Sequence, residues 1–514
     1  MTASIPVLIQ QMMQPGFYPH SVKEPIQLIQ THISYVFLTG EYAYKVKKPM
    51  NFGFLNYSTL EQRKHFCHEE LRLNQRGAAE LYLEVLPITG DEKQYQLGGT
   101  GEAVEYVLKM RQFPQEMLFV NLFEQGKLDD TLMEEMGRVV AQYHANAATN
   151  DYIRKFGEVA QIRQAFDENY QQTEKYVGSL QTQAQFEETK QYTDSFFDER
   201  SPLFTSRIEN NSIRECHGDL YMQNICLWHD KILLFDCIEF NEPFRFVDVM
   251  YDVAFAVMDF EAKHRPDLGN VFLNTYVEQT GDWEGLQLLP LYLSRQAYVR
   301  AKVNSFLMDD PGVPDAVKKE AKVAATNYYQ QAWEYTKPHQ GQLILMSGLS
   351  GSGKSTVARQ LARKIGAIHL RSDAVRKHLA GIPLQQKGGD EIYTAEMTQK
   401  TYERLLSLGM LLASQGFAVI LDAKYDRASF REEAIASAKS QQILLQIFHC
   451  NAPAEVLRER LQNRTGDIAD ATADLLEGQQ AAAQSFTETE KPSVKTVDTT
   501  QPLEPQLKGL GARG

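Results

Sequence analysis

The segment GLSGSGKST at residues 348–356 constrains this chain more than any other part of it. It satisfies the pattern GxxxxGK[ST], follows the apolar run Gln342–Ser347 and precedes a helical pattern over residues 357–365. Glycines let backbone N–H groups turn inward around phosphates, and the dipole of the following helix adds to the anion site. The order strand, loop, helix therefore predicts a phosphate-binding P-loop, with a site for magnesium and ATP or GTP.

Two side chains of this loop have roles that follow from the pattern. Lys354 would reach the β- and γ-phosphates, and the hydroxyl of Ser355 would ligate magnesium. A glycine-rich turn with an incidental lysine is the alternative, which the flanking strand and helix disfavour. The other loop residues that we expect to bind the nucleotide are Gly348, Ser350, Gly351, Ser352, Gly353 and Thr356.

A carboxylate follows the next strand-like run, residues 367–370. Asp373 could take a proton from an attacking hydroxyl, while Arg376 steadies the transferred phosphoryl group. In the alternative interpretation, Ser372 or Asp373 only caps the helix expected over residues 374–379. Spacing alone does not separate the two interpretations.

A further carboxylate, Asp422, ends the apolar run 417–421 and is either a magnesium-side carboxylate or a turn residue. A strand over residues 443–449 and a helix over residues 455–464 come next. Arg460 and Arg464 would share one face of that helix, where like charges repel unless an anion lies between them. They indicate a lid that closes on phosphates, or else a solvated basic face.

The set GLSGSGKST, RSDAVR, VILDA and RERLQNR resembles the small P-loop kinases of the polynucleotide kinase, gluconate kinase and zeta-toxin group. The resemblance covers residues 342–498. It implies that Asp373 is the acceptor-side base, that Arg376 is a substrate or phosphate clamp, and that Arg460 and Arg464 are lid arginines. One departure is Ala-Asp-Ala around Asp470, where relatives often show Ser-Asp-Ala.

The N-terminal part contains a second motif, HGDLYMQN at residues 217–224, which an apolar strand and Asp236 follow. This spacing is that of kinase-like phosphotransferases, in which Asp219 would orient a substrate hydroxyl and accept its proton. Asn224 and Asp236 would hold magnesium across the triphosphate. His217 is expected to brace the loop, and an ordinary polar loop is the disfavoured alternative.

Upstream residues supply a possible phosphate-binding cation. Residues 32–38 and Tyr42–Lys47 predict a β-hairpin, and Lys45 and Lys47 lie on the same face of its second strand. We favour Lys45 as the lysine that reaches the α- and β-phosphates. Glu70, on the following helix, would pair with it. Lys47, the neighbouring acid Glu69 and a merely solvated strand edge remain alternatives.

HGDLYMQN and LLFDCIEF resemble the aminoglycoside phosphotransferase-like kinases, a compact relative of the protein kinase fold. The resemblance covers residues 31–304 and implies an ATP site, while the acceptor stays open. Asp248 and Asp252 match acidic positions that follow the metal-binding Asp, and we assign them to structural support. The loop has Tyr221 where many relatives carry a second His.

These patterns predict two domains: an α+β, protein-kinase-like N-terminal domain and an α/β P-loop domain with a parallel sheet. The proposed boundaries are residues 1–336 for the first domain, 337–341 for a linker and 342–500 for the second domain. Residues 501–514, rich in Gly and Pro, would be a flexible tail.

Charge and cysteine content limit the partners and the compartment. A formal net charge of −13 argues against a broad nucleic-acid or anionic-membrane surface. The five cysteines form no CxxC pair, which favours reduced thiols in the cytoplasm. No apolar run reaches the length of a membrane-spanning helix.

The expected activity is therefore ATP- and Mg²⁺-dependent transfer of a γ-phosphoryl group to small hydroxylated acceptors, with one site in each domain. Two other hypotheses remain open. One is a nucleotide-dependent regulatory switch without a small acceptor. The other is a nucleic-acid end kinase in the P-loop domain, which the overall acidity weighs against.

Overall fold

The computed structural model describes residues 6–508, which form two compact units. Within the described residues, unit 1 gathers 6–128, Gln142–Ala165 and Arg200–Ala256, and unit 2 gathers Asp129–Ala141, Phe166–Glu199 and 257–508. Each unit thus joins segments that are distant in the sequence.

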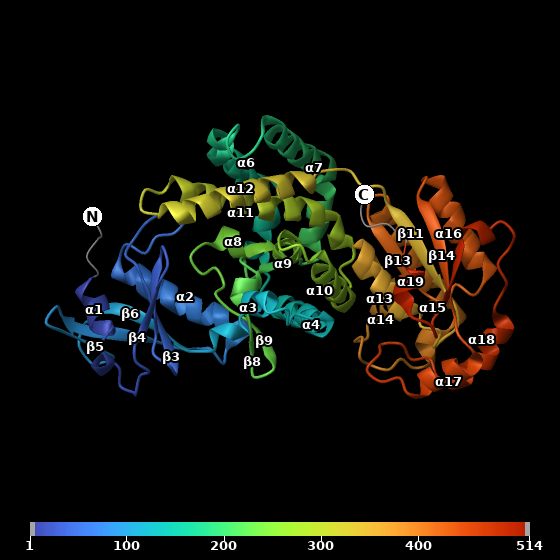
Figure 1. Ribbon diagram of the computed structural model, residues 1–514, viewed down its shortest axis with the longest axis horizontal. Coiled ribbons are helices and arrows are strands. Elements are labelled where there is room, and N and C mark those ends of the chain that lie inside the picture. Colours follow the sequence, from blue (N-terminus) through green and yellow to red (C-terminus); the bar gives the residue numbers. More distant parts are fainter. Residues whose placement is uncertain (1–5, 509–514) are drawn as a thin grey trace. The chain divides into compact units, whose positions relative to one another are not determined.

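Unit 1 is built around a six-stranded antiparallel sheet of order β1-β2-β3-β6-β4-β5 (Figure 1). Its strands are β1 Gln27–Gln30, β2 Ser34–Leu38, β3 Tyr42–Lys47, β4 Tyr82–Asp91, β5 Gln94–Leu97 and β6 Ala103–Arg111. The predicted hairpin is confirmed, because β2 and β3 pair with Val36 opposite Lys45. The sheet places Lys45 in a central strand.

Helix α2, Leu60–Ala78, packs against β4 and β6. A capping box starts it: the Thr59 side chain accepts from the Gln62 N–H, and the Gln62 side chain accepts from the Thr59 N–H. Further on, β8 Ile225–Trp228 and β9 Lys231–Leu234 form a hairpin, and β7 Ile213–Glu215 pairs with β10 Phe246–Asp248. The two loops that contain HGDLYMQN and Asp236 flank these strands.

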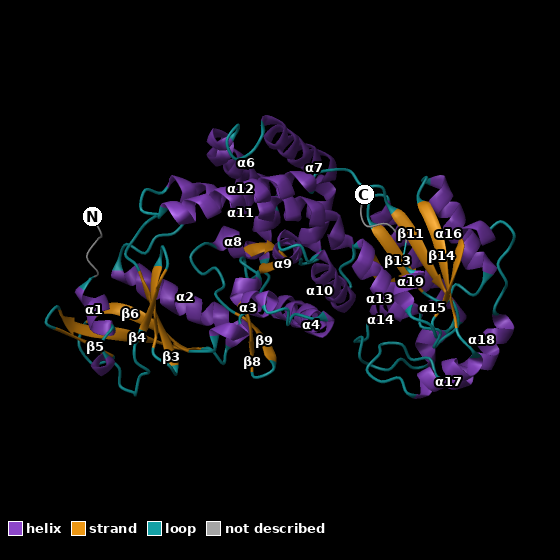
Figure 2. Cartoon of the chain, viewed as in Figure 1, coloured by secondary structure: helices purple, strands orange, loops and turns teal. Residues whose placement is uncertain are grey.

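Unit 2 contains a five-stranded parallel sheet of order β12-β13-β11-β14-β15, as predicted for the P-loop domain (Figure 2). The strands are β11 Gln342–Ser347, β12 Ile368–Arg371, β13 Ala418–Asp422, β14 Leu444–Asn451 and β15 Val494–Asp498. The register places Met346 opposite Asp422, so the strand that leads into the P-loop lies beside the strand that ends in an acid.

Helices bury both faces of this sheet. On one face, α13 Lys354–Ile365 packs its apolar side on Ile344 and Met346. On the other, α15 Ala395–Ala413 approaches so closely that a Cβ on Gly409 would lie 2.8 Å from Leu421 and 3.0 Å from Leu343. Alternate side chains of β11 therefore face helices on opposite sides of the sheet, which explains why all four residues 343–346 are apolar and buried.

The remaining helices complete the units. They are α1 Val7–Met12, α3 Phe119–Glu124, α4 Asp130–Asn146, α5 Asp151–Arg154, α6 Val159–Thr173, α7 Gln183–Glu209, α8 Glu242–Arg245, α9 Val249–Ala262, α10 Pro266–Thr280, α11 Leu289–Asp309, α12 Asp315–Glu334, α14 Ser372–Ala380, α16 Ala428–Ser440, α17 Ala454–Gln462, α18 Leu476–Ala482 and α19 Leu503–Gln506. None of the helices in residues 6–508 is both long and apolar enough to cross a bilayer.

Two expectations differ from the structure. Helix α17 ends at Gln462, so Arg464 lies beyond it and does not share a helix face with Arg460. Asn463 caps the end of the helix, and Gly466 then adopts a left-handed conformation that does not continue it. In the segment expected to be a flexible tail, α19 forms and Leu507 is 2% exposed. Leu507 packs in the core beside α13, which gives this segment an apolar anchor. The predicted tail beyond residue 508 lies outside the described residues.

Candidate functional sites

The P-loop of unit 2 depends on three glycines. Gly348, Gly351 and Gly353 have φ values of +137°, +78° and +85°, which L side chains rarely adopt. A Cβ at Gly348 would also lie 2.4 Å from the backbone oxygen of Cys450 on the neighbouring strand β14. The close approach of the loop to this strand therefore requires glycine at position 348. In glycine-rich loops of this type, backbone N–H groups gather around an anion.

Lys354 begins α13 directly after this loop. Its Nζ donates to the backbone oxygen of Leu349, 2.8 Å away, so the side chain folds back over the loop. Burial lowers the pKa of Lys354, against an opposing attraction from Asp422. Ser355 follows in the first helical turn. The hydroxyl of Ser352 is buried and makes no hydrogen bond within the described residues.

The other loop residues differ in exposure and contacts. The Ser350 N–H donates to the side chain of Gln479 at 3.1 Å. Ser355 is partly buried, whereas Thr356 is exposed. The loop directly follows β11, the central strand, and so lies at the carboxyl end of the sheet, where open parallel sheets bind ligands.

Two predicted acids lie at the same edge of the sheet. Asp422 ends β13, and its carboxylate contacts His369 Nε2 at 3.0 Å. Burial raises the pKa of Asp422, but the hydrogen bond and charge of His369 outweigh burial and hold it well below its usual range. Asp422 is therefore an anion close to the P-loop lysine.

Asp373 lies in the first turn of α14, immediately after β12. Neither Ser372 nor Asp373 caps this helix: the N-cap residue is Arg371, and no side chain makes a capping hydrogen bond. Burial raises the pKa of Asp373, Arg371 opposes that rise, and the negative charge of Asp422 adds to it. A carboxylate with a raised pKa is a better proton acceptor than an ordinary aspartate.

The predicted arginines bind separate segments. Arg376 is 8% exposed and donates to the Ile392 backbone oxygen at 3.0 Å, while its Nε has no hydrogen-bond partner within the described residues. Arg460 donates to the hydroxyl and the backbone oxygen of Thr499 at 2.9 and 2.8 Å. Arg464 donates to the backbone oxygen of Ala471. The structure therefore does not bring Arg460 and Arg464 into one pair.

Sequence reasoning missed several groups of unit 2. His369 sits within β12 and gave no motif signal, yet it contacts Asp422. Arg371 is 5% exposed, pairs with Asp467, and has a buried Nε without a hydrogen-bond partner in the described chain. Asp470, left without a role, accepts from the Tyr393 hydroxyl at 2.7 Å and from the Gly388 N–H at 3.0 Å.

In unit 1 the loop HGDLYMQN is closed by its own polar groups. Asn224 Nδ2 donates to both the backbone oxygen and a carboxylate oxygen of Asp219, each at 2.9 Å. His217 is fully buried; its Nε2 contacts the Phe235 backbone oxygen at 2.9 Å, and its Nδ1 accepts from the Asp219 N–H at 3.3 Å. His217 thus joins the loop to the residue before Asp236.

Asp236 and Glu70 both contact Lys45. The Nζ of Lys45 lies 2.7 Å from Glu70 Oε1 and 2.7 Å from Asp236 Oδ1. Glu69 instead pairs with Arg72 at 2.9 Å, so the acid that meets the lysines is Glu70. The three predicted residues Lys45, Glu70 and Asp236 therefore form one contiguous group, as do Asp219 and Asn224.

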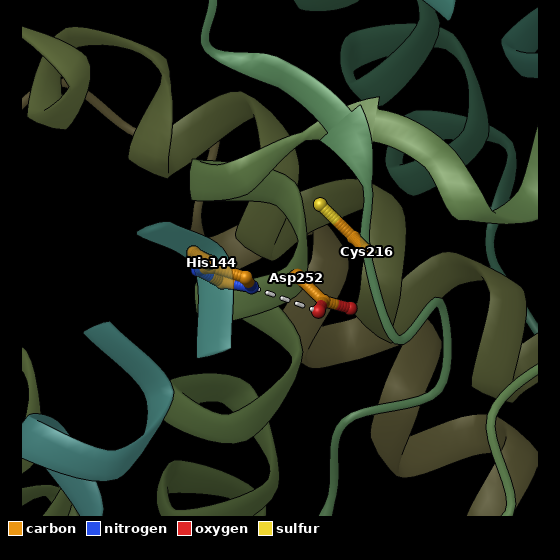
Figure 3. A group of neighbouring side chains, drawn as sticks. All are labelled: His144, Cys216 and Asp252. Carbon is orange, nitrogen blue, oxygen red and sulfur yellow. Dashed lines mark hydrogen bonds and ion pairs between the residues drawn. The ribbon is translucent and has the colours of Figure 1, made fainter. Parts of the chain in front are cut away.

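His144, Cys216 and Asp252 form a third group of neighbouring side chains (Figure 3), which adjoins the start of the loop. Their possible ligand atoms are within 4.8 Å of one another. Asp252, however, already accepts from the N–H groups of His217 and Gly218 at 2.9 Å each and contacts His144 Nε2 at 3.1 Å. Burial raises the pKa of Cys216, and the negative charge of Asp252 adds to that rise. The thiol therefore stays neutral.

These contacts suit bracing of the HGDLYMQN loop better than metal binding. Asp248, the other acid assigned to support, forms an ion pair with Arg207 at 2.7 Å. All five cysteines are buried and free.

Comparisons with known proteins match both the P-loop region and the whole chain. A family model described as an AAA domain matches residues 343–486. An uncharacterized protein of Mycobacterium tuberculosis is 29% identical over 485 residues, which is 93% of either chain. The adenylyl-sulfate kinase of Myxococcus xanthus is 31% identical over 130 residues, covering 23% of this chain and 63% of that kinase.

Among solved structures, a choline/ethanolamine kinase family protein from Mesorhizobium loti is similar over 64% of this chain and 99% of its own, at 10% identity and a TM-score of 0.38.

Proposed function

We propose that the chain is an ATP-dependent phosphotransferase with two nucleotide sites, each of which transfers a γ-phosphoryl group to a hydroxyl of a small molecule. The observation that carries the proposal is the meeting of the P-loop with two acids at one edge of the parallel sheet. Lys354 and Asp373 come after β11 and β12, and Asp422 ends β13, which lies between those two strands in the sheet.

At this edge each side chain has a separate task. Lys354 would leave the Leu349 oxygen and bind the β- and γ-phosphates, and the P-loop N–H groups would hold their oxygens. Ser355 and Asp422 would hold magnesium through their oxygens, and the metal would supply positive charge to the phosphates. Asp373 would accept the proton of the attacking hydroxyl, and the Nε of Arg376, which has no hydrogen-bond partner in residues 6–508, would donate to an anion.

Unit 1 would work with a different set. Lys45 would bind the α- and β-phosphates, Asn224 and Asp236 would hold magnesium, and Asp219 would accept the proton of the acceptor hydroxyl. The contacts of Lys45 with Glu70 and Asp236, and of Asn224 with Asp219, support this proposal, because they hold the phosphate-binding, metal-binding and proton-accepting residues in two contiguous groups.

The relative named adenylyl-sulfate kinase supports a kinase assignment for the P-loop part. We further propose residues 1–336 and 342–500 as the two kinase domains, joined by residues 337–341, with small hydroxylated acceptors and a cytoplasmic location. The acidic net charge of −13 supports small acceptors over nucleic acid.

Binding stoichiometry tests the two-site proposal. Calorimetric titration with a non-hydrolysable ATP analogue and magnesium should give two equivalents for the wild type and one for Lys354→Ala. Arg359→Ala, an exposed position on the same helix α13, is the matched control and should keep two. Unchanged stoichiometry in Lys354→Ala would contradict the P-loop assignment.

A metabolite-library screen identifies the acceptors. Asp219→Asn should abolish transfer by unit 1 with little loss of nucleotide affinity, because the carboxylate acts on the acceptor proton and not on ATP. An acceptor that Asp219→Asn no longer phosphorylates but Lys354→Ala still does is a substrate of unit 1. An acceptor with the reverse pattern is a substrate of the P-loop site. ATP hydrolysis that no acceptor stimulates would instead favour a regulatory switch.

A further inference from the structure

Lys47 is a second buried lysine in unit 1 that the proposed mechanism does not use. It lies two residues after Lys45 on β3, and its side chain is 1% exposed. Its Nζ contacts Glu70 Oε2 at 2.6 Å and also the carboxylate of Glu239. The Tyr57 hydroxyl donates to that same Glu239 carboxylate. Three buried partners thus surround Lys47.

Glu70 consequently holds one lysine on each carboxylate oxygen, Lys45 on Oε1 and Lys47 on Oε2. Its own side chain is 0% exposed. Burial raises the pKa of Glu70, but the charges of Lys45 and Lys47 outweigh burial and lower it to about 2. An ionised carboxylate at such depth requires a cation that stays in place, because an unpaired buried charge costs several kcal/mol.

The two lysines differ in their freedom to move. Lys45 contacts Asp236, whose side chain is 46% exposed, and Lys45 itself is 14% exposed. Among the described residues, the hydrogen-bond partners of the Lys47 Nζ are all buried: Glu70, Glu239 and Tyr57. Of the two, only Lys45 can turn towards a phosphate without leaving a buried carboxylate unpaired, provided that Lys47 remains on Glu70.

We propose that Lys47, held by Glu239 and Tyr57, is a positioning residue that keeps Glu70 neutralised and fixed while Lys45 binds the phosphates of ATP. The inference rests on the proposed nucleotide site of unit 1. Glu239 lies three residues after Asp236, so the same short segment carries the metal-side acid and the anchor of Lys47. The Lys47–Glu239 pair therefore ties β3 to that segment.

Nucleotide selectivity tests this role in the full-length Lys354→Ala chain, where only the site of unit 1 remains. A fluorescent ATP analogue with magnesium is titrated, and ATP and adenosine are compared as competitors. Lys47→Met should weaken ATP at least about tenfold and leave adenosine within about twofold, because adenosine has no phosphate for Lys45. A loss that is equal for both ligands would overturn the positioning role and leave only a structural one.

Two further variants guard against misfolding. The double variant Lys47→Met with Glu239→Gln removes one cation and one anion, so the local net charge is kept. Its melting temperature should be close to that of the Lys354→Ala parent, and it should still lose the preference for ATP over adenosine. Lys109→Met, on the neighbouring strand β6 and paired with the half-exposed Glu84, is the control and should bind as its parent does. Parental ATP affinity in a folded double variant would overturn the inference.

The same titration separates the inference from the function beneath it. If the Lys354→Ala chain binds no ATP analogue at all, the nucleotide site of unit 1 is refuted, and the inference falls with it. If that chain binds ATP and Lys45→Met abolishes binding while Lys47→Met does not, the site stands and only the role of Lys47 is wrong.

Discussion

At the scale of single residues, the two candidate sites shift the pKa of a buried carboxyl group in opposite directions. In unit 1, Glu70 gains two lysines and its pKa falls to about 2. In unit 2, burial and the neighbouring charge of Asp422 raise the pKa of Asp373. The first carboxylate is stabilised as an anion and suits a structural ion pair, whereas the second binds a proton more readily than an ordinary aspartate.

The lowered pKa of Glu70 makes the stability of unit 1 depend on pH. Because the folded value is about 2 and the ordinary value 4.5, the stabilisation is complete above pH 4.5 and is lost as the pH falls towards 2. A shift of this size corresponds to about 3 kcal/mol at neutral pH. Glu70→Gln should therefore be less stable than wild type at pH 7, and the difference should shrink below pH 4.5.

Urea denaturation followed by Trp228 fluorescence measures this effect. Trp228 lies in unit 1, whereas Trp283 and Trp333 lie in unit 2 and are replaced by Phe in every variant. Glu84→Gln removes an acid that is 49% exposed and should show almost no pH-dependent difference. A gap between Glu70→Gln and wild type that stays constant down to pH 3 would refute the assignment.

At the scale of elements, the parallel sheet is held by helices that meet it closely. Gly409 allows α15 to rest on Leu343 and Leu421. Gly409→Val should destabilise unit 2 by about 1–3 kcal/mol, because added methyl groups force the helix away from β11 and β13. The measurement is chemical denaturation with an unfolding signal from unit 2.

The matched control lies on the same helix. Ser407→Val introduces the same β-branched side chain at an exposed position of α15 and so isolates the packing cost from helix propensity. If the two variants lose equal stability, contact with the sheet is not the cause.

The helical segment 151–199 shows how far pattern reasoning reaches at this scale. Aromatic residues anchor this Gln- and Glu-rich segment: Phe166, Tyr170, Tyr176 and Phe197 are each 5% exposed or less, whereas Phe186 is only partly buried. The end of α17 was not predictable in the same way, since repeated arginines continue the helical composition past Gln462. Local sequence there does not reveal that Arg464 turns to the Ala471 oxygen.

At the scale of the whole molecule, net charge discriminates between acceptor classes. With a formal charge of −13, the chain should bind a 5′-hydroxyl oligonucleotide only weakly near physiological salt and transfer no phosphate to it. Fluorescence anisotropy at several salt concentrations, with radiolabelled ATP for transfer, tests this expectation. Tight binding that falls steeply with salt would reveal a local basic surface and revive the end-kinase hypothesis.

Several features of the protein follow from sequence alone, because they depend on neighbours along the chain. The P-loop conformation requires glycines at particular positions, and the strand before it and the helix after it are set by local apolar periodicity. The β2–β3 hairpin and the parallel sheet were predictable for the same reason. Spacing also placed Asp219 five residues before Asn224, the two groups that the structure joins by hydrogen bonds.

Tertiary structure alone decided which distant groups meet. Lys45 and Lys47 both point to the same face of β3, and only the packing of α2 shows that Glu70 takes both, while Glu239 and Tyr57 complete the surroundings of Lys47. Likewise, His369 meets Asp422 because β12 and β13 are neighbours in the sheet. Charge pairing across such sequence separations depends on burial and on strand order, and neither leaves a local pattern in the chain.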